Sequence, residues 1–328
     1  MLLLATSSAM AEELSRYEAA RPAMGSRFSI VLYAENDDQA RTAFGAAFRR
    51  IADLDQALND YDPRSELSKL SAASPTQSPV TASDDLWAVM LHSRRFHGES
   101  GGAFDVTVGP LTSLWREARR KKTLPTVKQR EAALAAVGFQ HVAMIEASQS
   151  ISLARANMRI DLGGIAKGFA VDEALAALKK HGIESALVNG GGDIAASAAP
   201  PLREGWKIGV APLAADAKPS RFLLIAHQAI ATSGDTWQFV EIDGVRYSHI
   251  VDPQTGLGLT ERSSVTVVAP DCTTADALAS AISVLGLTKG VALVERMEGA
   301  SALVIREVDG KVVQRESKRF EELRQEDK

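Results

Sequence analysis

Asp276 and Ser280 lie four residues apart in an apolar segment that is expected to be helical, so both side chains fall on one helix face. A carboxylate and a hydroxyl are hard oxygen donors, and a backbone carbonyl from a glycine loop would complete a set that suits Mg²⁺. The plainer interpretation is that Asp276 caps its helix, because a carboxylate is favourable at the positive end. Residue types and spacing leave both interpretations open.

His249 is a second candidate for chemistry, because an imidazole titrates near neutral pH and can move a proton. The alternative is a buried histidine with a structural hydrogen bond. The segment 252–256 (DPQTG) that follows has the composition of a turn. We therefore place His249 at the entrance to a loop.

Two glycine-rich segments could lie against a ligand. The segment 161–168 (DLGGIAKG) follows a predicted strand and opens a predicted helix, so its free N–H groups suit an anion such as phosphate. Lys167 falls in the first helical turn, where the helix dipole disfavours a cation unless an anion offsets it. The segment 189–195 (NGGGDIA) matches the dinucleotide fingerprint G-x-G-x-x-A, but Pro200-Pro201 arrive too soon for a crossover helix. We expect its glycines to pack against a ligand or a neighbouring strand.

Two further loops have weaker signals. In the segment 59–68, Ser65 and Ser68 are interpreted as turn and cap residues. In the segment 101–110 (GGAFDVTVGP), glycines flank an acid and a hydroxyl, a pattern that fits close approach to a ligand and also a simple turn.

The elements that must position these residues follow from hydrophobic periodicity. Helices are predicted at 39–58, 86–97, 166–180 and 274–285. Strands are predicted at 28–33, 142–145, 151–153, 185–188, 206–210, 222–225, 247–251, 265–268 and 302–305. The run 119–122 (RRKK) is interpreted as a solvated helix end, and 315–328 as a solvated helix or tail. The irregular alternation, with hairpin-like pairs, favours an α+β fold over a doubly wound parallel sheet.

Composition excludes several classes of protein. The 328 residues include 37 Lys and Arg against 41 Asp and Glu, for a formal charge of −4, and 5% aromatic residues. This balance disfavours nucleic acid as a partner. The single Cys272 excludes an intramolecular disulfide and a thiolate-rich metal site. Because no stretch approaches about 20 consecutive apolar residues, we expect no transmembrane segment.

The first residues have a targeting pattern. Residues 1–11 (MLLLATSSAMA) combine a short apolar run with the small-x-small end of a signal-peptidase site. We interpret them as a signal peptide whose start lies upstream, which predicts a periplasmic or otherwise exported protein. A frayed N-terminus on a cytoplasmic protein is the alternative. Residues 12–328 are then expected to form one domain.

Six blocks in this order resemble the ApbE-type FAD:protein FMN transferases, from Met24 to Gly286. The blocks are Met24-Gly25-Ser26, Tyr61 with 65–68, 102–111, 161–172, 188–193, and 248–256 with 275–280. The resemblance implies an α+β domain of two lobes with the flavin between them. It also implies an enzyme that splits FAD in the presence of Mg²⁺ and attaches the FMN half, through its phosphate, to a Thr or Ser of an acceptor flavoprotein, releasing AMP. The implied acceptor has a motif of the type D-G-x-x-S/T-A/G-x-T.

The same resemblance implies roles for individual residues. The positions that match flavin-contacting ones are Met24, Tyr61, Ala103, Phe104, Asp105, Asp161, Lys167 and Ile250. The positions that match metal ligands are Gly164, through its carbonyl, Asp276 and Ser280, which stands where Thr is more usual. His249 is the candidate base that takes the acceptor's proton, and Asp276 could share that task through a metal-bound water. Two alternatives use the same site: a Mg²⁺-dependent FAD pyrophosphatase that releases FMN and AMP, and a periplasmic flavin carrier without turnover.

Overall fold

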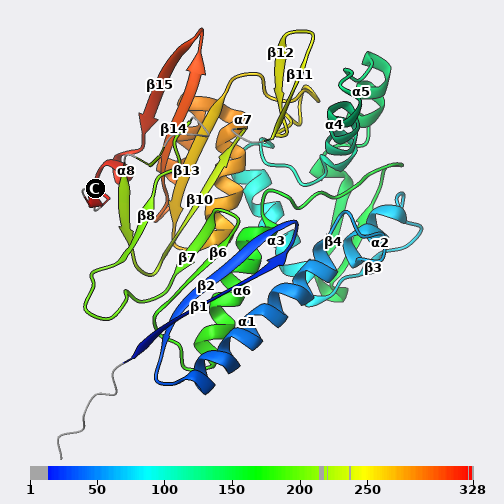
Figure 1. Ribbon diagram of the computed structural model, residues 1–328. Helices are drawn as coiled ribbons and strands as arrows, with labels where there is room; N and C mark the ends of the chain where they lie inside the picture. Colours follow the sequence, from blue (N-terminus) through cyan, green and yellow to red (C-terminus); the bar gives the residue numbers. More distant parts are fainter. Residues whose placement is uncertain (1–13, 214–217, 220, 236–237, 324, 327–328) are drawn as a thin grey trace, which may run out of the picture.

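The computed structural model describes residues 14–213, 218–219, 221–235, 238–323 and 325–326 (Figure 1). Residues 1–11, which the sequence predicts to be a signal peptide, lie outside the described residues. The largest element is a sheet of eight strands in the order β1-β2-β6-β7-β10-β13-β14-β15. Each neighbouring pair in it is antiparallel. Its strands are β1 (Ser15–Ala23), β2 (Ser26–Ala34), β6 (Ala186–Gly190), β7 (Asp193–Ala196), β10 (Gln228–Gly234), β13 (Ser263–Ala269), β14 (Ser301–Val308) and β15 (Lys311–Glu316).

Three helices cover one face of this sheet, with α6 (Ala166–Lys180) packed between α1 (Asp37–Leu58) and α7 (Cys272–Arg296). The other face carries a small sheet of β8 (Trp206–Gly209), β9 (Phe222–Ile225) and β16 (Gln325–Glu326), with α8 (Lys318–Glu321). Strand β13 lies between both layers and is buried along its whole length. Successive side chains of a strand point to opposite faces, so Val267 joins the core under the helices and Val268 joins the core under the small sheet.

The remaining elements lie beside the helical layer (Figure 1). They are α2 (Glu66–Ala72), α3 (Asp84–Glu99), α4 (Gly109–Lys121), α5 (Val127–Leu134), the 3₁₀ turns at Phe139–His141 and Glu146–Ser148, the sheet β3 (Val80–Thr81)–β5 (Ser150–Leu153)–β4 (Val142–Ile145), and the hairpin β11 (Phe239–Ile242)–β12 (Val245–Ser248). A separate apolar cluster joins α4 to that hairpin and includes Trp115, Val240 and Ile242. Trp115 also donates a hydrogen bond of 2.8 Å from Nε1 to the carbonyl of Gly256, which fixes the turn after His249 against α4.

The α+β class and the predicted elements are confirmed, with two corrections. The strand predicted at 247–251 ends at Ser248, because the chain turns there toward the Asx turn in which Asp252 Oδ1 accepts from the N–H of Gln254 at 2.7 Å. The stretch 315–328 is not simply a solvated helix or tail. It completes β15, and Phe320 of α8 is fully buried beneath the small sheet.

Helix α7 bears on the expectation that the chain has no transmembrane segment. Among the described residues it is the one helix long and apolar enough to cross a membrane by length and composition. Its apolar window is 61% buried inside the protein, where it packs on α6, β10 and β13. It also breaks at Gly286 (φ 76°, ψ −174°), one residue after the predicted helix end. These features are those of a core helix.

The junction between α6 and α7 depends on two residues one turn apart. A side chain at Gly168 would meet the carbonyl oxygen of Cys272, so only glycine allows the two helices to approach this closely. Asp172, four residues later, accepts hydrogen bonds from the backbone N–H groups of Cys272 and Thr273, both at 2.8 Å, and from the Thr273 hydroxyl at 2.5 Å. A carboxylate from one helix therefore satisfies the free donors at the start of the other.

Replacing Asp172 by Ala is expected to lower the free energy of unfolding by about 2–4 kcal/mol, because the donors of Cys272 and Thr273 lose their acceptor in the interior. Urea denaturation followed by circular dichroism measures this loss. The control is Asp38→Ala, an exposed carboxylate on α1 that pairs with Arg41. Equal stability of the two variants would contradict the assigned role of Asp172.

Candidate active site

A cavity of about 720 Å³ lies where the tips of β1, β2, β6 and β7, the end of α1, the helix α4 and the starts of α6 and α7 converge. All twelve residues that the sequence singled out line it. They are Met24, Tyr61, Ala103, Phe104, Asp105, Asp161, Gly164, Lys167, His249, Ile250, Asp276 and Ser280. Residues separated by as much as 256 positions thus meet in one cavity.

Met24 is held at the cavity by the turn between β1 and β2. Ala23 pairs with Ser26, so the hairpin loop has two residues, and both Met24 (φ 49°) and Gly25 (φ 67°) are left-handed, as a type I′ turn requires. This backbone is unusual for methionine, and a hydrogen bond of 2.8 Å from the Met24 N–H to Asp55 of α1 secures it. The tip of the β6–β7 hairpin packs against this turn, since a side chain at Gly191 would collide with Ser26.

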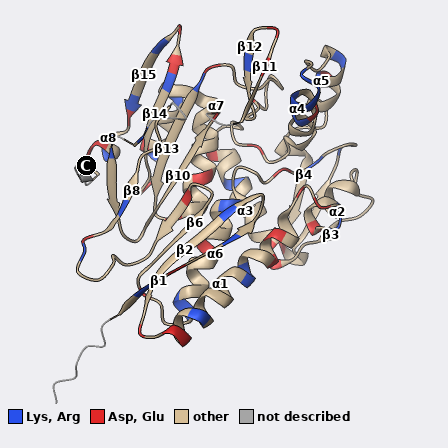
Figure 2. Cartoon of the chain, in the orientation of Figure 1, with Lys and Arg blue, Asp and Glu red and all other residues tan. Residues whose placement is uncertain are grey.

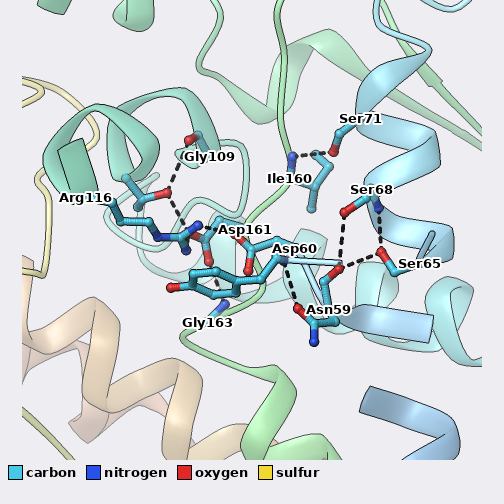
Figure 3. Close-up of polar contacts among 12 residues, drawn as sticks. Asn59, Asp60, Ser65, Ser68, Ser71, Gly109, Arg116, Ile160, Asp161 and Gly163 are labelled. Carbon is cyan, nitrogen blue, oxygen red and sulfur yellow. Dashed lines mark hydrogen bonds and ion pairs between the residues drawn. The ribbon is translucent and has the colours of Figure 1, made fainter. Parts of the chain in front are cut away.

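The cavity wall near Tyr61 is an ionic cluster (Figure 3). Arg116 of α4 contacts Asp60 at 2.6 Å and Asp161 at 2.9 Å, and its guanidinium lies 4.1 Å from the centre of the Tyr61 ring. The loop that holds Tyr61 is anchored to the start of α2, because the hydroxyls of Ser65 and Ser68 both donate to the carbonyl of Asn59. Ser65 is the N-cap of α2, as predicted from the sequence, whereas Ser68 lies in the first turn of that helix.

The carboxylate of Asp105 is used inside its own loop. It accepts from the N–H and hydroxyl of Thr107, at 2.8 and 2.6 Å, and from the N–H of Phe139 at 3.3 Å. His97 lies 3.4 Å from it. Asp105 therefore shapes the loop that presents Ala103 and Phe104 to the cavity.

The predicted metal ligands Gly164, Asp276 and Ser280 all line the cavity. A side chain at Gly164 would come within 2.7 Å of the Ser280 hydroxyl, so the glycine backbone packs directly against that oxygen. Asp276 is not the cap of α7, because Asp271 occupies that position and accepts from the N–H of Thr274. The plainer interpretation of Asp276 was wrong. Burial, followed by the nearby carboxylate of Asp193, raises the pKa of Asp276 to about 7.

Lys167 is paired with Asp193, a residue that follows the three glycines of the β6–β7 turn. An anion thus offsets the cation in the first turn of α6, as the helix dipole requires. Lys167 and Asp193 are both mainly buried. Burial alone would lower the pKa of Lys167, but the carboxylates of Asp193 and Asp276 outweigh it, so the pKa of Lys167 lies above its ordinary value. The glycines serve close packing, because a side chain at Gly190 would collide with Phe28 and Val171.

His249 is oriented by the backbone. Its Nδ1 lies 3.1 Å from the carbonyl oxygen of Gln238, which can only accept, so the neutral ring carries its proton on Nδ1. The Nε2 lone pair is then available as a proton acceptor. Burial is the main reason that the pKa of His249 falls below its usual value. Burial thus favours the neutral imidazole.

Sequence reasoning missed several cavity residues, including Asp55, Arg116 and Asp193. One signal was available: Thr112, Arg116 and Arg119 are spaced four and three residues apart, so they share one face of α4, and all three line the cavity. The run 119–122 was interpreted as a solvated helix end (Figure 2). That holds for 120–122, which are exposed, but Arg119 lines the cavity.

Known proteins share this sequence and fold. The family model described as "ApbE family" matches residues 24–304. The chain is 32% identical to the FAD:protein FMN transferase of Vibrio cholerae, over 94% of this chain and 92% of that one, and 32% identical to that of Treponema pallidum, over 88% and 84%. The solved structure of the flavin transferase ApbE from Vibrio cholerae superposes with a TM-score of 0.85 at 31% identity, covering 95% of this chain and all of that one. The ApbE protein of Thermotoga maritima gives a TM-score of 0.85 at 29% identity, with the same coverage. This chain belongs to the ApbE family.

Proposed function

We propose that this chain is a Mg²⁺-dependent FAD:protein FMN transferase. The observation that carries the proposal is that one cavity is lined both by His249, whose Nδ1 faces the Gln238 carbonyl, and by the oxygen donors Gly164, Asp276 and Ser280. The curated relatives named above are FAD:protein FMN transferases, and they cover most of this chain. These observations support a cavity that takes a nucleotide substrate, a metal and a base together.

The cavity's charge supports a divalent cation. Its described lining includes six Asp residues but only three Lys and Arg residues. A site with this excess of carboxylates would repel a pyrophosphate unless a cation were added. Asp276, Ser280 and the Gly164 carbonyl are hard oxygen donors of the kind Mg²⁺ takes, and one carboxylate is typical for Mg²⁺ that keeps its waters. When bound, Mg²⁺ would neutralise charge on the FAD phosphates.

The chain's own residues orient the substrate and move one proton. Lys167, in the first turn of α6, orients the phosphates, while the N–H groups of Asp161, Gly163, Ile165 and Ala166 are used within the loop itself or against Val106. The acceptor's hydroxyl oxygen forms a bond to the FMN phosphorus, and the bond from that phosphorus to the bridging oxygen breaks, so AMP leaves with the electron pair. His249 Nε2 takes the hydroxyl proton, while Gln238 keeps the imidazolium oriented through Nδ1.

The acceptor and the compartment belong to the same proposal. The acceptor is a flavoprotein whose segment of the type D-G-x-x-S/T-A/G-x-T supplies the hydroxyl. The small-x-small pattern at Ala9-Met10-Ala11 supports export to the periplasm or an equivalent compartment.

A single incubation separates this function from its competitors. The protein is mixed with FAD, Mg²⁺ and an acceptor fragment that carries the motif, and the fragment mass and AMP are followed. A mass gain of one FMN on the fragment, with matching AMP, is the expected result. AMP without a mass gain would indicate a pyrophosphatase, and neither product would indicate a carrier.

Asp276→Asn is expected to lower Mg²⁺-dependent AMP release on the order of 100-fold or more, because the neutral amide is a poor Mg²⁺ ligand. The amide oxygen can still accept from the N–H of Gly168, so the fold is expected to survive. AMP release is titrated with Mg²⁺ in this variant and in Ser280→Thr, which keeps its hydroxyl and serves as the matched control. Native activity in Asp276→Asn would remove Asp276 from the metal site.

His249→Ala is expected to bind FAD as the native protein does but to transfer FMN about 100- to 10,000-fold more slowly, the usual contribution of a general base. In the native protein, transfer needs neutral His249. Because the pKa of His249 lies below its ordinary value, the rate is expected to hold as pH falls through that value and to decline only below it. Quenched time points of FMN transfer, taken over a pH series, measure both the rate lost in His249→Ala and the pH dependence of the native rate.

The control for this variant is His181→Ala, an exposed histidine at the end of α6 that lies outside the cavity lining. Its transfer rate should equal the native rate. Undiminished transfer by His249→Ala would refute the assignment of the base.

A further inference from the structure

Arg116 joins three segments of the cavity wall through one guanidinium group (Figure 3). Nη1 contacts Asp60, in the loop after α1, at 2.6 Å, and Nη2 contacts Asp161, in the loop before α6, at 2.9 Å. The side chains of Arg116, Asp60 and Asp161 are 25%, 16% and 8% exposed, so solvent screens these contacts only partly. Thr112, one turn earlier on α4, donates to the same oxygen of Asp161 at 2.6 Å.

The same guanidinium supports Tyr61. It lies 4.1 Å from the centre of the ring, which is a cation–π arrangement. Tyr61 is nevertheless 72% exposed, so Arg116 backs the ring while most of its surface faces the open cavity. The backbone N–H of Tyr61 donates to Asn59 at 2.8 Å, which fixes the loop below. A large exposed aromatic held this firmly beside a cavity is suited to stacking.

We infer that Arg116 is a positioning residue for FAD, resting on the proposed function. It neutralises the Asp60–Asp161 pair in the cavity wall and holds the Tyr61 ring in place, so that a negatively charged dinucleotide can enter. Without Arg116, two carboxylates would face the incoming pyrophosphate with no cation between them. Burial and the nearby Asp161 already raise the pKa of Asp60, which agrees with this mutual repulsion.

The first test measures FAD binding alone, by fluorescence titration of the whole protein with no acceptor. Arg116→Met removes the charge and keeps most of the stem, and it is expected to weaken FAD binding about tenfold or more, as loss of one partner from a partly buried ionic cluster does. Arg116→Lys keeps the charge but not the planar fork, so it should recover part of the loss. Arg120→Met, on the same helix but exposed and outside the cavity lining, is the control and should bind normally.

The second test separates charge from structure. In the Arg116→Met background, Asp60→Asn removes one of the two uncompensated carboxylates and should restore much of the FAD affinity. A merely structural role predicts no restoration, because an amide at position 60 restores neither the guanidinium contact to Asp161 nor the support of the Tyr61 ring. In turnover assays, Arg116→Met should raise the KM for FAD while leaving kcat and the acceptor KM within about twofold of native values.

Unchanged FAD affinity in Arg116→Met, or no recovery in the double variant, would overturn the inference. If Arg116→Met does not fold, Asp60→Asn in the native background tests the inference instead. This variant should bind FAD as tightly as the native protein or more tightly, and weaker binding would contradict the positioning role of Arg116. Native protein that binds no FAD would instead contradict the proposed function. The two failures are therefore distinguishable.

Discussion

The close packing of α6 on α7 is the constraint on which the site depends. Gly168 allows the helices to touch, and Asp172 ties the start of α7 to α6 by three hydrogen bonds. One turn along α7 from that contact is Asp276, which accepts from the N–H of Gly168 at 3.1 Å. The register of the two helices thus determines where the proposed metal ligand lies relative to Lys167. Any shift of one helix along the other would separate the carboxylate of Asp276 from the ammonium group of Lys167.

The large sheet supplies the opposite side of the cavity by a similar principle. Two hairpin tips end there, and glycines at 25 and 191 permit the tight turns and the contact of one tip with the other. Because β2 and β6 are paired along their length, the position of Met24 and that of Asp193 are fixed together. Residues on helices and residues on turns are therefore held to one geometry by pairing and packing.

Much of this could be predicted from the sequence, for identifiable reasons. Helix α1 has a clear amphipathic pattern, α7 stands out as a long apolar segment, and the six ordered blocks contain every residue that was expected in the site. Arg116 and Asp193 could not be assigned in the same way, because each acts through partners far along the chain: Asp60 and Asp161 for one, Lys167 for the other. Local sequence shows a charge but not its counter-ion. The prediction that 315–328 is a solvated helix or tail was wrong for a related reason. Phe320 is buried because the small sheet, which is distant in the sequence, covers it.

The charge of the cavity connects these observations. A chain of formal charge −4 with six Asp residues around one cavity is poorly suited to an anionic dinucleotide, unless each carboxylate has an assigned partner. Asp55 accepts a hydrogen bond from the N–H of Met24, and Asp105 accepts one from the N–H of Thr107. Asp60 and Asp161 both pair with Arg116, and Asp193 pairs with Lys167. Asp276 remains, with one backbone donor and a pKa raised to about 7. It is the carboxylate whose charge the proposed divalent cation would best compensate, because the other five carboxylates have partners within the protein.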